Sequence, residues 1–213
     1  MKPISKLAAA LAAALALAGG LVMAGPGAAR AAGAAPAAVV PAFDWNEIIF
    51  PGILSQSNVL CLDDPGGSTQ AGHPLQLWHC HGSGSNGAPQ RWQFIPVATA
   101  PDGRTAYVIR NTGSFFCLDA GVPIGTILPP PSTIFQNVCP IIGSSTATVW
   151  LIRNPDVVAP AQFELEMADL DSGAVTASGW CMSAVNSNDV NGSPLTWTGN
   201  CSTNDPRELL TLG

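Results

Sequence analysis

Short apolar segments separated by turn residues recur along most of the chain. Beyond about residue 44, each segment is about four to seven residues long, contains β-branched and aromatic residues, and is bounded by Gly, Pro, Asn or Ser. This pattern is typical of β-strands, and no segment beyond the N-terminal region repeats its apolar residues at the period of an amphipathic helix. The sequence therefore predicts an all-β domain.

The predicted strands form three sets with the same internal order. Each set has an apolar opening run, a short strand that contains a cysteine, an alternating run before a second cysteine, and a closing run. The opening runs are 48–54, 106–110 and 163–167; the cysteine strands are 60–63, 116–119 and 180–183; the third runs are 75–78, 134–137 and 195–198; the closing runs are 91–95, 149–152 and 209–212. We expect twelve strands in three repeats, at about 44–100, 101–156 and 157–213. Because one repeat is too short to enclose its own core, the repeats should pack around a pseudo-threefold axis.

The cysteines follow the same threefold pattern. Cysteine separations of 19, 22 and 20 residues alternate with gaps of 37 and 42. An even number of cysteines favours disulfides over thiol catalysis or zinc binding if the chain is exported, as its N-terminal residues indicate below. Six cysteines allow 15 pairings.

The first 32 residues have the features of a secretory signal peptide. Two lysines precede an Ala/Leu-rich run, and the small residues around Arg30 offer a cleavage site. An uncleaved membrane anchor is the alternative, but the glycines at 19–20 interrupt the run. We expect a signal peptide at 1–32, an Ala/Pro-rich linker at 33–43 and a secreted, extracellular domain at 44–213, with no membrane association once the leader is removed. The composition suggests a bacterial source.

Charge excludes one class of partner. Charged residues make up 10% of the chain, and outside the leader five arginines and no lysine face 14 carboxylates, a net charge of −9. Binding to nucleic acid requires clusters of Lys and Arg that displace counterions from phosphates. We therefore expect no nucleic-acid partner.

Three motifs in the first repeat point to a family. Cys-Leu-Asp at 61–63, Gln-Leu-Trp-His-Cys at 76–80 and Gln-Arg-Trp at 90–92 resemble the Cys-x-Asp, Gln-x-Trp-x-Cys and Gln-x-Trp signatures of the ricin-type β-trefoil lectin family. The resemblance covers about 44–213, is partial in the second repeat and weak in the third. It implies a β-trefoil of three pseudo-symmetric four-strand repeats, stapled by one disulfide within each. The implied pairs are Cys61 with Cys80, Cys117 with Cys139, and Cys181 with Cys201.

The resemblance also implies a carbohydrate site in the first repeat. Asp63 would accept hydrogen bonds from sugar hydroxyls, Trp78 would stack on the apolar face of the sugar, and Gln76 and Gln90 would orient the carboxylate or add polar contacts. The family suggests galactose-type sugars or xylan as the glycan. Pro89 departs from the family pattern, because it stands where sugar-binding members commonly carry an Asn donor.

Each of these residues also has a structural interpretation. Gln90 can satisfy backbone groups at a strand end, Asp63 can cap a turn, and Trp78 can fill a gap in the packing. Trp92 and Trp150 are expected in the core, and Trp197 is expected to pack rather than bind.

The other two repeats lack parts of the site. The second keeps Asp119 but has Asn137 at the platform position, while the third has Ser183 in place of the Asp, and Arg207 and Leu209 at the Gln and Trp positions. The remaining changed positions are Ala147, Thr148, Thr198 and Gly199. We expect both of these sugar sites to be lost.

No enzyme or metal site is expected. The sequence has no Gly-x-Ser-x-Gly elbow and no phosphate-binding loop, and Glu164 and Glu166 alternate on a strand without forming an evident acid–base pair. His79 and His81 flank Cys80, which is assigned to a disulfide. The hypothesis is a monomeric lectin-like module without catalytic residues, metal or cofactor; with one site, it would agglutinate cells only as an oligomer. The alternative is a secreted protein-interaction or inhibitor module on the same scaffold.

Overall fold

The structure is a computed structural model. It describes residues 45–55, 58–82, 85–121, 134–140, 147–153, 162–202 and 204–213. The expected signal peptide and linker lie outside these residues. No helix in the described ranges is long and apolar enough to cross a membrane.

Six strands close into a ring. They are β1 (Trp45–Ser55), β5 (Arg91–Thr99), β6 (Thr105–Asn111), β9 (Ala147–Arg153), β10 (Glu164–Asp171) and β13 (Thr211–Leu212). Antiparallel pairs join β1 to β5, β5 to β6, β6 to β9 and β9 to β10. The ring is completed by a bridge between Phe163 and Leu210 and by the pairing of β13 with β1. Closure leaves this part of the sheet without free edges.

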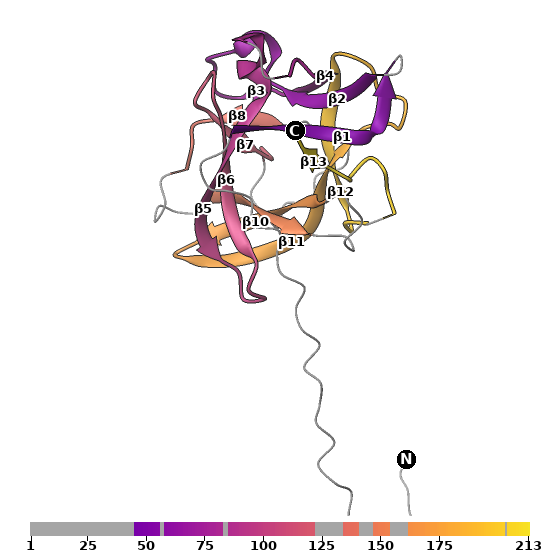
Figure 1. Cartoon of the computed structure of the whole chain (residues 1–213). Helices are drawn as coiled ribbons and strands as arrows, with labels where there is room; N and C mark the ends of the chain where they lie inside the picture. The colour runs from indigo at the N-terminus through magenta and orange to yellow at the C-terminus, as the bar shows by residue number, and fades with distance from the viewer. Residues whose placement is uncertain are drawn as a thin grey trace, which may run out of the picture. The chain divides into compact units, whose positions relative to one another are not determined.

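Each repeat adds one hairpin to the ring. The hairpins are β2 (Asn58–Asp63) with β4 (Gln76–His79), β7 (Cys117–Asp119) with β8 (Phe135–Asn137), and β11 (Ala174–Ala184) with β12 (Ser193–Gly199). The short strand β3 (His73–Pro74) pairs with β8. Of two 3₁₀ segments, η1 (Pro65–Gly67) lies between β2 and β4 and η2 (Ser85–Gln90) follows β4. In Figure 1, β2 and β4 lie together with β12 beside β4. This architecture is the expected β-trefoil.

The hairpin registers show that the three repeats are equivalent. The first cysteine of each repeat lies opposite Trp78, Asn137 and Thr198 in turn. Two residues further on, the pairs are Asp63 with Gln76, Asp119 with Phe135, and Ser183 with Thr196. These registers let any position in one repeat be compared with its counterparts.

The closing strand of each repeat inserts a large apolar side chain into the core. Trp92 and Trp150 are fully buried, and their Nε1 atoms donate to the carbonyls of Leu62 and Leu118, each at 3.1 Å. Leu210 is the buried counterpart in the third repeat. The buried indoles thus keep their polar atom hydrogen-bonded, as low-dielectric packing requires.

Three disulfides join the cysteines as the family resemblance implies. Cys61 bonds to Cys80, Cys117 to Cys139, and Cys181 to Cys201. Each bond therefore lies within a single repeat.

Two residue assignments in the third repeat are one position off. The sequence comparison placed Arg207 and Leu209 at the Gln and Trp positions, whereas the strand register places Glu208 and Leu210 there. The buried Glu208 carboxylate accepts a hydrogen bond from the Ser202 amide at 2.6 Å, just as Gln90 accepts one after the second cysteine of the first repeat. The third repeat has neither Gln nor Trp at these positions, so no residue type fixed the alignment of this strand in the sequence.

Candidate carbohydrate site

Three of the four proposed contact residues share one face of the first hairpin. Asp63 lies opposite Gln76, and Cys61 lies opposite Trp78. Because side chains alternate along a strand and paired residues point to the same side, Asp63, Gln76 and Trp78 belong to one face of β2 and β4. This face also carries the Cys61–Cys80 disulfide.

The polar part of this face is an Asp–Gln pair. Gln76 Nε2 donates to Asp63 Oδ2 at 2.7 Å. Asp63 is only 4% exposed, while Gln76 is half-buried. An ionised carboxylate has about four lone-pair directions, so the bond to Gln76 fixes its orientation and leaves acceptor capacity for hydroxyl groups.

The aromatic part is Trp78, whose ring is half-buried. The third repeat supplies the neighbouring wall, since β12 pairs with β4 and the Gly192 amide donates to the Leu77 carbonyl at 2.9 Å. A Cβ at Gly192 would stand 3.9 Å from both Gln76 Oε1 and Trp78 Cζ3, so the glycine lies directly beside both side chains. Asn191 further ties the two repeats by accepting from the His79 amide at 2.8 Å.

Gln90 occupies a different environment. It is fully buried, its Nε2 donates to the His79 carbonyl at 2.9 Å, and its Oε1 accepts from the His81 amide at 2.7 Å. Its amide group therefore links the backbone on both sides of Cys80. Gln90 thus satisfies backbone groups at a strand end, as its structural interpretation holds. It affects the site only by fixing the backbone at the end of β4.

Pro89 also serves the backbone. Its carbonyl accepts from the Asp64 amide at 3.0 Å and from Asn111 Nδ2 at 2.9 Å. The Asn donor expected by the family pattern is absent at this position, so the site lacks one polar contact that it would otherwise offer.

A second carboxylate lies directly behind the site. Asp64 is fully buried, and neither oxygen has a hydrogen-bond partner within bonding geometry. Burial raises the pKa of Asp64 from 3.8 to about 7. The negative charge of Asp63 also raises this pKa, whereas the nearby Ser68 amide and Ser114 hydroxyl lower it. A protonated Asp64 would spare Asp63 the repulsion of a second negative charge.

The counterparts in the other repeats cannot reproduce this face. In the second repeat, Asn137 at the platform position donates to Asp119 Oδ2 at 3.0 Å. In the third, Ser183 is buried and donates to the adjacent Ala184 carbonyl, and Thr198 at the platform position donates to Glu208.

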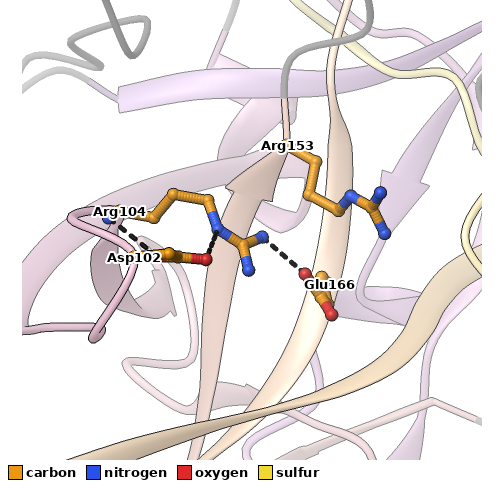
Figure 2. Close-up of a pocket in the computed structure, with 4 residues that line it drawn as sticks. All are labelled: Asp102, Arg104, Arg153 and Glu166. Carbon is orange, nitrogen blue, oxygen red and sulfur yellow. Dashed lines mark hydrogen bonds and ion pairs between the residues drawn. The ribbon is translucent and has the colours of Figure 1, made fainter. Parts of the chain in front are cut away.

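An open pocket of about 410 Å³ lies elsewhere, on the barrel strands (Figure 2). Its lining residues are Asp102, Arg104, Arg153 and Glu166. Arg104 bridges two carboxylates, because Nε donates to Asp102 and Nη1 to Glu166. Arg153 lies 3.6 Å from the buried Glu164, whose pKa is raised by burial. No residue of the candidate site lines this pocket. The bonds of Arg104 to Asp102 and Glu166 connect the turn before β6 to β10.

Groups of metal-ligating side chains were found in two places. One contains Glu47 with Cys61 and Cys80, and the other contains Glu164, Cys181 and Glu208. All of the cysteine sulfurs involved are in disulfides, so they offer no thiolate to a cation.

The closed six-strand ring and the three equivalent hairpins define a β-trefoil. The family model of the ricin-type beta-trefoil lectin domain matches residues 51–128. This match covers the first repeat and the beginning of the second, and it agrees with the resemblance seen in the motifs of the first repeat. It supports a carbohydrate-binding module. A comparison with curated proteins gave no match.

Solved structures show the same fold at low sequence identity. The designed three-fold symmetric protein ThreeFoil is 14% identical with a TM-score of 0.52, covering 79% of this chain and 96% of that one. The Rhizoctonia solani agglutinin is 15% identical with a TM-score of 0.51, covering 81% and 96%. The exo-beta-1,3-galactanase 1,3Gal43A from Clostridium thermocellum is 12% identical with a TM-score of 0.53, covering 81% of this chain and 30% of that enzyme.

Proposed function

We propose that this protein is a secreted, non-catalytic carbohydrate-binding module with a sugar site on the β2–β4 face. The observation that carries the proposal is the alignment of a carboxylate, an amide and a half-buried indole on one side of the hairpin: Asp63, Gln76 and Trp78. A pyranose has hydroxyls at its edge and C–H bonds on its face, which match this combination of polar and aromatic groups.

Each residue then has a distinct part. Trp78 stacks on the sugar, Asp63 accepts from hydroxyls, and Gln76 holds the carboxylate in place through its 2.7 Å bond while presenting its Oε1 to the sugar. Gln90 contributes by fixing the end of β4. Because Asp63 is 4% exposed and Pro89 supplies no side-chain donor, we expect weak, millimolar-range affinity for monosaccharides.

The three disulfides fit an extracellular location, since disulfides persist in oxidising compartments.

Galactose-type sugars and xylan fragments are the first ligands to test. The exposed Asp171 is outside the site and provides a matched control for carboxylate removal.

The test is a titration of the oxidised domain with galactose, lactose and xylo-oligosaccharides, followed by tryptophan fluorescence. We expect saturable binding that Asp63→Asn and Trp78→Ala abolish and Asp171→Asn preserves. No response up to tens of millimolar from the folded domain would refute the sugar site and favour the protein-interaction alternative.

A further inference from the structure

The three disulfides occupy equivalent positions but have different charged neighbours. We number them by repeat, so the second disulfide is Cys117–Cys139. In each pair the first cysteine is buried and the second is half-buried, so the exposure of the cysteines does not distinguish the three bonds. Thiol–disulfide exchange is sensitive to charge, because one thiolate attacks and another leaves. Neighbouring charges should therefore decide which bond is cleaved first.

The residue paired with the first cysteine differs in charge between the repeats. These pairs are Ile49 with Cys61, Arg110 with Cys117, and Glu166 with Cys181. Directly paired side chains point to the same side of a sheet, so the second disulfide alone has a cation at this position.

The guanidinium of Arg110 is held in place. Arg110 Nη2 donates to Gln93 Oε1 at 2.7 Å, and the guanidinium carbon lies 5.8 Å from the ring centroid of Phe115 and 5.9 Å from that of Trp45. The carbonyl of Phe115 in turn lies 3.4 Å from Cys139 Sγ. A fixed cation on this side of the hairpin stabilises a thiolate that leaves from the second disulfide.

The first and third disulfides have carboxylates beside their sulfurs. An oxygen of Glu47 lies within 4.8 Å of both sulfurs of the first disulfide, and oxygens of Glu164 and Glu208 lie within 4.8 Å of Cys181 Sγ. The strand registers place Val108 at the position of Glu47 and Glu164, and Val108 packs in one apolar cluster with both cysteines of the second disulfide. A carboxylate so close repels an attacking thiolate and disfavours the thiolate that leaves.

Other charges do not cancel this difference. Near the third disulfide, Arg104 already pairs with Glu166, and Arg153 lies 3.6 Å from Glu164. No charged residue occurs between positions 120 and 152, the stretch that contains Cys139. Asp119 lies two residues after the first cysteine of its pair, as Asp63 does in the first repeat, so it does not distinguish these two bonds.

The second disulfide also anchors a strand that supports the first repeat. Its second cysteine lies just beyond β8, which pairs with β3. The Gly72 amide donates to the Gln136 carbonyl at 2.8 Å, and the Leu75 amide donates to the Ile134 carbonyl at 2.9 Å. Leu75 immediately precedes Gln76, the first residue of β4. Freeing β8 from the disulfide should therefore weaken the support of the segment that leads into the candidate carbohydrate site.

We propose that the second disulfide is a redox-sensitive switch, which dithiols cleave before the other two bonds and whose cleavage loosens residues 72–75. A thiolate of the dithiol attacks Cys139 Sγ, the S–S bond breaks, and Cys117 leaves as a thiolate on the side of Arg110. The second thiolate of the dithiol then attacks the mixed disulfide and releases Cys139. The reductant becomes a cyclic disulfide, so two electrons pass to the cysteines. Only the effect on sugar affinity rests on the proposed function.

The first test is the order of reduction. The oxidised protein is treated with dithiothreitol at pH 8, samples are alkylated with iodoacetamide at intervals, and peptide mass spectrometry measures each disulfide separately. We expect the second disulfide to be reduced about tenfold faster than either of the others. Equal rates, or earlier reduction of another disulfide, would overturn the proposal.

Charge variants test the cause of this order. Arg110→Met should slow reduction of the second disulfide by about threefold or more, while Arg110→Lys should retain the rate. Glu47→Gln should speed reduction of the first disulfide and leave the second unchanged. Arg207→Met is the matched control, because this arginine pairs with Asp205 in the third repeat. If Arg110→Met and Arg110→Lys are reduced equally fast, the role of the cation is refuted.

The second test examines the segment before β4. Protein in which only the second disulfide is reduced and alkylated is compared with oxidised protein by hydrogen exchange. The Gly72 and Leu75 amides should exchange about tenfold faster or more, whereas the Ala184 amide, bonded to the Arg207 carbonyl, should be unchanged. Unchanged exchange at Gly72 and Leu75 would overturn the switch.

Sugar titrations separate the switch from the proposed function. The Kd for lactose or xylo-oligosaccharides, followed by tryptophan fluorescence, should rise when the second disulfide is reduced and alkylated. An unchanged Kd would refute control of the sugar site. If the oxidised protein binds no sugar, the proposed function fails, while the order of reduction and the exchange rates still decide whether the switch exists.

Discussion

Replacing Asp64 by Ala should stabilise the protein at neutral pH. The Asp64 amide donates to the Pro89 carbonyl, and at the same place in the third repeat the Ala184 amide donates to the Arg207 carbonyl. The corresponding residues of the other repeats, Ala120 and Ala184, are both buried. The scaffold therefore accommodates alanine here, and the substitution removes a buried carboxylate that has no hydrogen-bond partner.

The size of the effect follows from the pKa. Burial raises the pKa of Asp64 from 3.8 to about 7, so above pH 7 the folded protein must hold an ionised group that the unfolded chain would solvate. This difference of about three pKa units between the folded and unfolded states corresponds to roughly 4 kcal/mol, at 1.36 kcal/mol per unit. Because Ser68 and Ser114 partly favour the ionised form, we expect Asp64→Ala to raise the free energy of unfolding by about 2 to 4 kcal/mol at pH 8.

The sign of the pH dependence is also fixed. Because the folded pKa is raised, the contribution of Asp64 to stability is fully present below pH 3.8, falls as the pH rises and is lost above about pH 7. The difference between Asp64→Ala and wild type should therefore be small near pH 4 and largest at pH 8. Subtracting the two proteins cancels the titration of other carboxylates.

Urea unfolding of the oxidised proteins between pH 4 and pH 8, followed by tryptophan fluorescence, measures this difference. Asp64→Asn tests the charge alone, because it keeps the size of the side chain. The reasoning fails if Asp64→Ala is less stable than wild type at pH 8, since the ionised carboxylate would then be stabilised by its surroundings. It also fails if the difference between the two proteins does not change with pH.

Three further perturbations test the fold. Arg104→Met should lower the free energy of unfolding by about 1 to 3 kcal/mol, because it leaves the buried Glu166 carboxylate without its cationic partner. Thermal melts in low and high salt would check this, and an unchanged melting temperature would show that the ion pair makes no net contribution to stability. Replacing Cys181 and Cys201 by Ser together should cost about 3 kcal/mol in urea unfolding, as expected for a loop of about 20 residues. Trp92→Phe should cost about 1 to 3 kcal/mol by removing the indole hydrogen bond and leaving a cavity, while a loss below 0.5 kcal/mol would contradict its core role.

The sequence predicted the elements that repeat regularly. The three sets of strands and their order follow from alternation and cysteine spacing, because these depend on local pattern. The trefoil fold was implied by the family resemblance, and Trp92 and Trp150 lie in the core as expected. The burial of Gln90 does not follow, since a polar residue at a strand end can face either solvent or backbone. Asp64 is adjacent to a motif residue in the sequence. Only the strand register of the repeats shows that the equivalent positions, Ala120 and Ala184, are occupied by alanine.

The disulfides within repeats affect how the chain can be oxidised. The two cysteines of each native pair are 19, 22 and 20 positions apart, whereas successive pairs are 37 and 42 positions apart. Closing a loop within a repeat therefore costs about 0.5 kcal/mol less free energy than closing one of the longer loops between successive pairs. The unfolded chain is thus biased toward the native connectivity before any strand has formed. Shuffling among wrong pairings should consequently limit the recovery of this protein less than it would limit one whose disulfides connect distant segments.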